Sequence, residues 1–283
     1  MHPPISPKFS EKIEKTRKIL RNLEQDASLL PEERREIWVK YLRSHTQHYL
    51  MVFSLFEDVD SAARILEVGS FPGHLTILLK KMGYSVTGVD ISPDAILPLM
   101  TTFGIPVIRL DIEREPLPFE DQTCDVAVFT EVFEHLRNNP IHAILEISRV
   151  LKPGGLLLFS IPNITPMDRI RFLLGRDYQD SPLRAYQKLQ EFGFCGHFRL
   201  YSRREATEIL QFAGFDMERV VRKGKLPKRI WKWIAYLSGP FVDQFRSHIY
   251  FVCRKKIRTA RQTTFVRPSD GRDFCESIAG NEF

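Results

Sequence analysis

An acidic residue followed at once by spaced glycines is the feature of this chain best suited to ligand chemistry. Residues 64–74, RILEVGSFPGH, have the pattern of an apolar strand that reaches Glu67 and runs into a glycine-containing turn. A second apolar run, SVTGV at 85–89, ends on Asp90. Parallel strands bring their carboxyl ends to one edge of a sheet, where such folds bind ligands. We therefore expect two neighbouring acids that bind a cationic, ribose-bearing ligand.

Phosphate-bearing cofactors fit this turn poorly. The G-x-G-x-x-G turn of dinucleotide-binding proteins lets the backbone approach a pyrophosphate closely, but Phe71 takes the second glycine position here and Glu67 adds negative charge. The segment GSFPGHLT also lacks the lysine with which a P-loop contacts phosphate. S-adenosylmethionine fits better, because it has no phosphate, carries an amino group and a positive sulfur, and offers ribose hydroxyls to a carboxylate.

The first motif also carries a family resemblance. The run E67-V-G69-S-F71-P-G73 resembles the first motif of class I S-adenosylmethionine-dependent methyltransferases, and the resemblance covers about residues 60–255. It implies that the acid and the glycine turn hold the methionine moiety, that the acid ending strand two binds the ribose, and that an acid after strand three contacts the adenine. On this basis the predicted cofactor-binding residues are Glu67, Gly69, Ser70, Phe71, Gly73, Asp90, Ile91, Asp111, Ile112 and Glu131.

Two histidines are candidates for the proton transfer that an oxygen acceptor requires. The segment TEVFEHL, residues 130–136, resembles the part of the small-molecule branch that follows strand four and lines both cofactor and acceptor. His135 within it can accept a proton near neutral pH, and His197 in GHFRLYS is the second candidate. The alternative for each is a structural histidine bonded to a loop. The sequence predicts no metal ligands.

The spacing of apolar runs predicts the elements that position these residues. Helical periodicity covers 11–57, and strands then alternate with helices. Strands are expected at 65–68, 85–90, 106–111, 124–130 and 156–162, after a KPGG turn, and later at 215–222 and 248–254. Helices are expected at 73–82, at 93–102 with Ser92 as its cap, after Pro140, and after the capping box that begins at Ser202.

This order predicts an α/β, Rossmann-like, doubly wound seven-stranded sheet, mostly parallel with an antiparallel last strand. N-terminal helices and a cap after strand five complete the predicted fold. The expected organisation is an N-terminal helical extension (1–60), a methyltransferase domain (61–256) and a polar C-terminal tail (257–283). Within the domain, 163–200 is the cap insertion and 223–245 is a basic and aromatic excursion.

Composition limits the partners and the compartment. The excess of 41 basic over 35 acidic residues is modest, and the four cysteines are too far apart for a metal knuckle or a dense disulfide framework. No signal peptide or long apolar run is evident, so a soluble, cytoplasmic protein is expected. Trp231 and Trp233, among basic residues, suggest peripheral contact with the inner face of a membrane, although packing onto the domain or stacking on RNA are alternatives.

We therefore predict a methyltransferase that uses S-adenosylmethionine to modify a small-molecule or glycan acceptor, most simply at oxygen. The resemblance is to bacterial enzymes of glycan and secondary-metabolite pathways. Nucleic-acid methylation is disfavoured, because no N/D-P-P-Y motif follows strand four. Two alternatives stay open: a quinone or lipid acceptor at a membrane surface, and a non-catalytic scaffold that retains the fold. The oligomeric state is not predicted.

Overall fold

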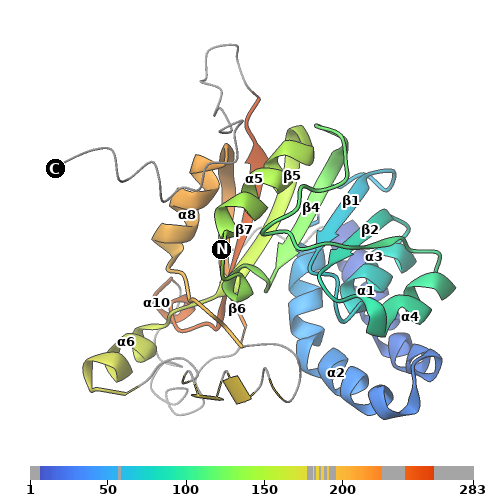
Figure 1. The fold of residues 1–283 in the computed structure, drawn as a ribbon, viewed down its shortest axis with the longest axis horizontal. Coiled ribbons are helices and arrows are strands. Elements are labelled where there is room, and N and C mark those ends of the chain that lie inside the picture. The colour runs from blue at the N-terminus through green and yellow to red at the C-terminus, as the bar shows by residue number, and fades with distance from the viewer. Residues whose placement is uncertain are drawn as a thin grey trace.

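A seven-stranded sheet in the order β3-β2-β1-β4-β5-β7-β6 forms the centre of the computed structural model (Figure 1). The structure describes residues 7–56, 59–176, 196–224 and 240–257, with positions 181, 183, 184, 186, 187 and 190. The strands are β1 (Arg64–Val68), β2 (Ser85–Asp90), β3 (Val107–Arg109), β4 (Cys124–Thr130), β5 (Leu151–Pro162), β6 (Phe215–Lys223) and β7 (His248–Lys255). β1 to β5 pair in parallel and β7 runs antiparallel to both of its neighbours, which confirms the predicted fold class.

Helices cover both faces of the sheet, and Figure 1 shows the sheet between them. Residues of the first three helices pack in one buried cluster and those of α5 and α8 in the other. The helices are α1 (Pro7–Asp26), α2 (Glu32–Ser54), α3 (His74–Lys81), α4 (Leu97–Thr102), α5 (Pro140–Val150), α6 (Pro166–Leu173), α8 (Arg203–Phe212) and α10 (Pro240–Asp243), with short 3-10 turns η1 (Ala27–Leu29), η2 (Asp94–Ile96) and η3 (Phe133–His135).

The sequence of β4 shows why it occupies the middle of this sandwich. Val126 and Val128 belong to the cluster under α1–α3, whereas Ala127 and Phe129 belong to the cluster under α5 and α8. Successive side chains of a strand point to opposite faces, so a central strand needs apolar residues at every position. This packing fixes the end of β4, from which the candidate site continues.

Two predicted boundaries are wrong. Ser92 does not cap a helix: η2 begins at Asp94 without a side-chain cap, and the amide of Ser92 instead donates to Asp90. The KPGG segment does not precede strand five but lies inside β5, where the pairing register shifts between Cys124 and Val126 and leaves 152–155 as a bulge. Local turn signals do not reveal that Lys152 is held there by an ion pair with Asp125.

Other boundaries follow the local chemistry. Ser202 and Glu205 form the predicted capping box of α8, and Thr165 and Asp168 form a second one at α6, inside the cap segment. Trp231 and Trp233 lie outside the described residues, as does nearly all of the predicted tail. Within the part of the chain that the structure describes, no helix is long and apolar enough to cross a membrane.

Candidate active site

A pocket opens at the carboxyl ends of β1 and β4, with α2 as its opposite wall. It is lined by Glu67, by residues 69–75 and 130–132, and by Tyr41, His45, His48 and Tyr49 of α2. Six of the ten predicted cofactor residues meet there, namely Glu67, Gly69, Ser70, Phe71, Gly73 and Glu131. The structure thus brings the first predicted motif and the residue after β4 to one cavity.

The turn after β1 takes a conformation that requires glycine. Gly69 has a φ angle of 80° and Gly73 one of 91°, both in the left-handed region. A Cβ atom on Gly69 would overlap the Cγ2 methyl of Val132, and one on Gly73 would lie 2.5 Å from Cε of Met100. The amide of Gly69 donates to the carbonyl of Val89 at 2.8 Å, which ties the turn to β2. The turn therefore presents bare backbone to the cavity.

Glu67 is a buried carboxylate at the base of this turn. The residue is only 4% exposed, and its Oε2 atom has no hydrogen-bond partner among the described residues. Burial raises its pKa from 4.5 to about 8, and the charge of Asp90 adds to the shift. A buried acid with an unsatisfied oxygen is suited to a ligand that brings a positive charge.

Asp90 connects the turn to the end of β2. Its Oδ2 atom accepts the amide of Phe71 at 2.9 Å, and its Oδ1 atom accepts the amide of Ser92 at 2.8 Å. Both carboxylate oxygens therefore hold backbone in place, while the half-buried side chain stays at the rim. Phe71 and Ile91 beside it are 51% and 63% exposed, which leaves apolar surface for a planar ring to contact.

Asp111 and Ile112 come after β3, which lies next to β2 in the sheet. Neither residue lines the pocket. The register pairs Asp90 with Arg109, so Asp111 continues just beyond the same sheet edge. Its Oδ1 atom accepts the amide of Glu113 at 3.0 Å, and Oδ2 lies 3.5 Å from Nε of Arg114. The carbonyl of Ile112 contacts Nδ1 of His142 at 2.9 Å. This part of the site is already well ordered by local hydrogen bonds.

Aromatic and histidine side chains of α2 were missed by the sequence analysis. Tyr41, His45 and His48 are spaced by four and three residues, which places them on one helix face toward the pocket. The rings of Tyr41 and His45 stack at 3.8 Å, and Nε1 of Trp38 donates to the carbonyl of Pro72 at 2.8 Å. The spacing of these three residues along one helix face was available as a signal. Nothing local indicated that α2 would cover the glycine turn.

Glu131 is held by residues from two other strands. The hydroxyl of Ser160 donates to Oε1 at 2.7 Å, and Nε2 of His248 lies 3.2 Å from Oε2. Although burial alone raises the pKa of Glu131, the hydrogen bond and charge of His248 lower it to about 2. Next to it, Nδ1 of His48 lies 2.9 Å from the hydroxyl of Tyr250, and burial lowers the pKa of His48 to about 4. The pocket therefore faces the anionic carboxylate of Glu131 and the neutral imidazole of His48.

The two predicted proton acceptors, His135 and His197, come together outside the pocket lining. Their ring centroids lie 5.1 Å apart, and the Nε2 atom of each lies 3.9 Å from Oε1 of Glu134. Glu134 is fully buried, and burial together with the charge of Glu131 raises its pKa well above the ordinary value. The carbonyl of Glu134 accepts the amide of Phe198 at 2.7 Å, which joins η3 to the end of the cap segment. Glu134 itself was not predicted.

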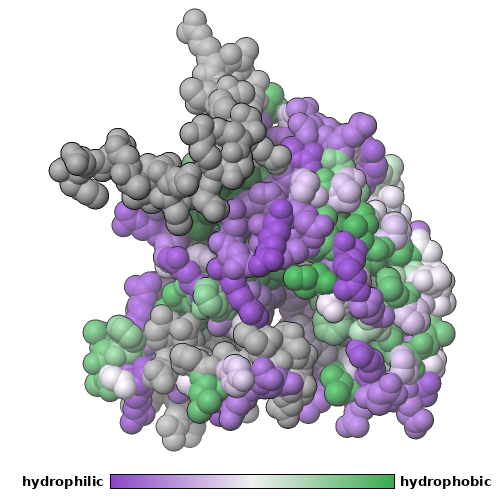
Figure 2. Space-filling view, in the orientation of Figure 1, coloured by the Kyte–Doolittle hydropathy of each residue, from purple (hydrophilic) through white to green (hydrophobic). Residues whose placement is uncertain are grey.

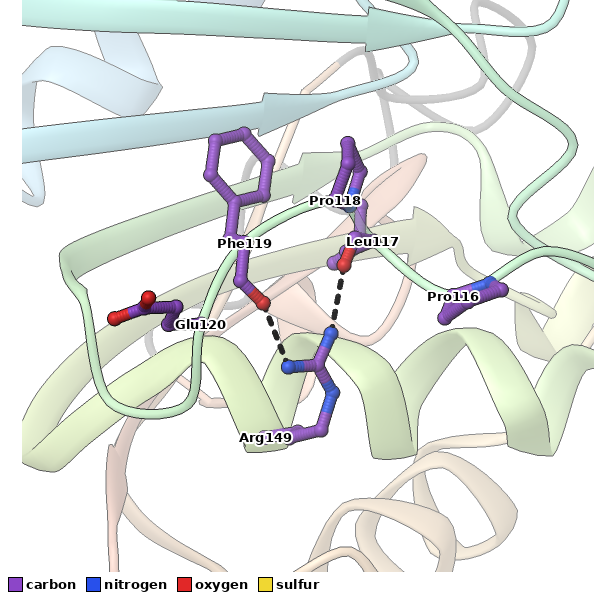
Figure 3. A pocket seen from close by; sticks show the side chains of 6 residues that line it. All are labelled: Pro116, Leu117, Pro118, Phe119, Glu120 and Arg149. Carbon is purple, nitrogen blue, oxygen red and sulfur yellow. Dashed lines mark hydrogen bonds between the residues drawn. The ribbon is translucent and has the colours of Figure 1, made fainter.

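A second depression, which shares no lining residue with this pocket, has a structural explanation. It lies between the loop 116–120 and Arg149 of α5 (Figure 3). The guanidinium donates to the carbonyls of Leu117 and Phe119, each at 2.7 Å, and pairs with Glu146 and Asp121. These contacts fasten the loop to the helix, so we assign the depression no ligand.

Comparisons with known proteins agree with this arrangement. A family model described as a methyltransferase domain matches residues 32–220. The chain is 32% identical over 157 residues to a probable S-adenosylmethionine-dependent methyltransferase of Mycolicibacterium smegmatis, covering 54% of this chain and 52% of the relative. It is 27% identical over 168 residues to a ubiquinone biosynthesis O-methyltransferase of Pseudomonas entomophila, covering 58% and 72%. The chain spans about half the length of the mycobacterial relatives that it matches.

Solved structures share the fold. An S-adenosylmethionine dependent methyltransferase from Mesorhizobium loti superposes with a TM-score of 0.53 at 17% identity, covering 75% of this chain and 98% of that one. A Burkholderia thailandensis 1,6-didemethyltoxoflavin-N1-methyltransferase, solved with S-adenosylhomocysteine, gives a TM-score of 0.51 at 15% identity, covering 91% and 93%. At these identities the likeness shows the shared architecture.

Proposed function

Because this chain belongs to the class I S-adenosylmethionine-dependent methyltransferases, we propose that it transfers a methyl group from S-adenosylmethionine to an oxygen of a small-molecule or glycan acceptor. The observation that carries the donor assignment is the buried carboxylate of Glu67, with its unpartnered Oε2 atom, beside a turn that only glycine can form. Such a site suits a ligand with a cationic amino group and no phosphate.

Each part of the donor has residues that fit it. Glu67, Gly69, Ser70 and Gly73 surround the methionine end, with Glu131 on the far side of the pocket. Asp90 and the exposed face of Ile91 are assigned to the ribose, and Asp111 and Ile112 to the adenine. When bound, the cofactor supplies an electrophilic methyl group on a positive sulfur. The chain contributes mainly positioning, for which effective molarities of about 10⁵ M are attainable.

An oxygen acceptor also needs a group that takes its proton. We assign this to His135 and His197, which lie together past the carboxyl end of β4. An imidazole is the side chain that most often serves as a general base. The polar wall formed by Tyr41 and His45 of α2 suits a hydroxylated acceptor better than an apolar one. The relative named as a ubiquinone biosynthesis O-methyltransferase also supports oxygen as the methylated atom.

A second candidate, a quinone or lipid acceptor at a membrane surface, is favoured by the surface of α6. Phe172, Leu173 and Leu174 are 64%, 82% and 71% exposed. Arg169 and Arg171, which are also exposed, come just before them in the sequence. Exposed basic and apolar residues side by side suit an anionic bilayer. Figure 2 shows hydrophobic residues gathered at the place of α6 in Figure 1. In this version the protein is cytoplasmic and peripheral to the inner face of a membrane.

Product labelling tests the proposed function. Purified protein is incubated with methyl-labelled S-adenosylmethionine and fractionated host extract, and the labelled product is located by mass spectrometry. Label in a hydroxylated water-soluble product supports the first candidate, and label in the lipid fraction supports the second. Cofactor binding without any labelled product from any fraction would support a non-catalytic scaffold instead.

Flotation with anionic liposomes tests the membrane version separately. Wild-type protein should float with the vesicles and Leu173→Glu should not. Ile37→Glu, which alters an exposed apolar residue on α2, should behave as wild type. Wild-type protein that stays at the bottom of the gradient would remove the membrane-surface candidate.

A further inference from the structure

The carboxylate of Glu134 is buried without a hydrogen-bond partner among the residues that the structure describes. The residue is 0% exposed, and neither Oε1 nor Oε2 has a hydrogen-bond partner among the described residues. Nε2 of His135 and Nε2 of His197 each lie 3.9 Å from its Oε1 atom. Burying a carboxylate without hydrogen bonds or a counter-charge costs several kcal/mol, by order of magnitude. A bound cation is one way to compensate such a group.

The hydrogen bond made by Nδ1 of His135 determines which nitrogen of the neutral ring carries the hydrogen. Nδ1 of His135 lies 3.1 Å from the carbonyl of Gly196, and a carbonyl oxygen can only accept, so Nδ1 carries the hydrogen. In the neutral ring Nε2 then has a lone pair, and Nε2 is the atom directed at Glu134. A lone pair that faces a carboxylate oxygen is unfavourable, and a cation bound by both atoms would relieve this repulsion. A histidine that donates Nδ1 to a backbone carbonyl while its Nε2 binds a metal is a common ligand arrangement.

We propose that Glu134, His135 and His197 form a binding site for a divalent transition-metal ion of the Zn²⁺ type. Their ligand atoms all lie within 4.8 Å of one another. A tetrahedral zinc site with bonds of about 2.1 Å separates its ligand atoms by about 3.4 Å, so small side-chain adjustments would close the site. Two imidazoles with one carboxylate suit zinc and its first-row neighbours better than Mg²⁺ or Ca²⁺, which prefer oxygen ligands throughout.

An ion bound at this cluster would have two effects, one on the structure and one on the chemistry of the site. Glu134 and His135 belong to η3, just past β4, whereas His197 lies near the end of the cap segment. An ion would therefore fasten two segments that the amides of Phe198 and Arg199 already join to the carbonyl of Glu134. Three protein ligands would leave a coordination position for a water or an acceptor oxygen, whose pKa a bound Zn²⁺ would lower. With the ion bound, His135 and His197 would act on the acceptor proton through the metal and not as free bases. The binding of the ion itself does not depend on the proposed methyl transfer.

Metal titration tests the proposal without any activity measurement. Full-length protein is stripped with a chelator, dialysed and titrated with Zn²⁺ by calorimetry. A second metal-free sample is titrated with Co²⁺, whose visible absorption bands report the coordination. We expect one equivalent of Zn²⁺ per chain, and His135→Gln and His197→Gln should each weaken binding by about tenfold or more. His142→Gln, a half-buried histidine of α5 outside the cluster, should bind as wild type.

Two outcomes would overturn the proposal. One is the absence of stoichiometric Zn²⁺ binding to wild-type protein, and the other is binding that His135→Gln, His197→Gln and Glu134→Gln all leave unchanged, which would place the ion elsewhere, for example on cysteines. Circular dichroism of each variant checks that it is folded. His197 lies at the surface and Gln matches the volume of Glu134, so at least these two variants should fold. Neither outcome decides whether the protein transfers a methyl group, because that test measures a labelled product and not the binding of an ion.

Discussion

Gly69 and Val132 pack against each other so closely that a β-carbon on residue 69 would overlap the Cγ2 methyl of residue 132. Gly69 also has a φ angle of 80°, which side-chain-bearing residues rarely adopt. Two independent constraints thus require glycine at this position: the conformation of the turn after β1 and its contact with the turn after β4. The turn after β1 and the turn after β4 are therefore mechanically joined here.

Gly69→Ala should therefore cost more stability than an ordinary glycine substitution. A left-handed conformation alone costs about 1–2 kcal/mol for an alanine, and overpacking adds about 1–3 kcal/mol. Gly83→Ala provides the matched control, because Gly83 has a φ angle of 102° but nothing within 4 Å of the added atom. Urea unfolding of both variants gives the comparison. Equal losses would show that the contact with Val132 carries no energy.

Glu67 should make cofactor binding release a proton. Its pKa of about 8 means that roughly nine-tenths of the free protein carries this proton at about pH 7, while a cationic ligand favours the ionised form. Calorimetry in two buffers of different ionisation enthalpy measures the release. In Glu67→Gln the release should vanish and the affinity should fall by about tenfold or more. Identical proton release in the variant would contradict the assignment.

The same group makes a prediction for the stability of the free protein. A carboxyl whose folded pKa is raised from 4.5 to about 8 contributes its full share of stability below 4.5 and loses it as the pH rises toward 8. Glu67→Gln cannot ionise, so its melting temperature relative to wild type should increase between about pH 5 and pH 8. A difference that stays constant with pH would argue that Glu67 is not desolvated.

His135 and His197 should affect turnover without affecting the cofactor. Neither lines the pocket with Glu67, so His135→Gln and His197→Gln should bind S-adenosylmethionine as wild type does. At least one should lower kcat by about 10²-fold or more, the usual contribution of a group that handles a proton. Once an acceptor is found, kcat and cofactor Kd are measured side by side. Full turnover in both variants would remove the assigned role.

The sequence was most informative where a local pattern matches a local element. The run ending at Glu67, the glycine turn and the alternation of strands with helices all follow from short-range rules, and the sheet order agrees with them. The boundary predictions failed where a contact that the local motif does not reveal decides the structure. The carboxylate of Asp90 accepts the amide of Ser92, which therefore begins no helix, and the pairing of Cys124 with Leu151 extends β5 before the expected turn.

The candidate site was predictable in part for the same reason. Residues of the glycine turn could be named because the motif itself contains them. His48 of α2 and His248 of β7 could not, since they approach Glu131 only through the tertiary packing of distant elements. His135 and His197 were named separately, but no sequence signal indicated that both would face the buried carboxylate of Glu134.

Titration of the protein with S-adenosylmethionine by calorimetry tests the central claim most directly. We predict one site per chain in wild-type protein. Asp90→Ala, which frees the amides of Phe71 and Ser92, should weaken binding by about tenfold or more. Asp216→Ala, which removes an exposed acid on β6 far from the pocket, should bind as wild type. Absence of binding to wild-type protein, or equal affinity in Asp90→Ala, would contradict the account.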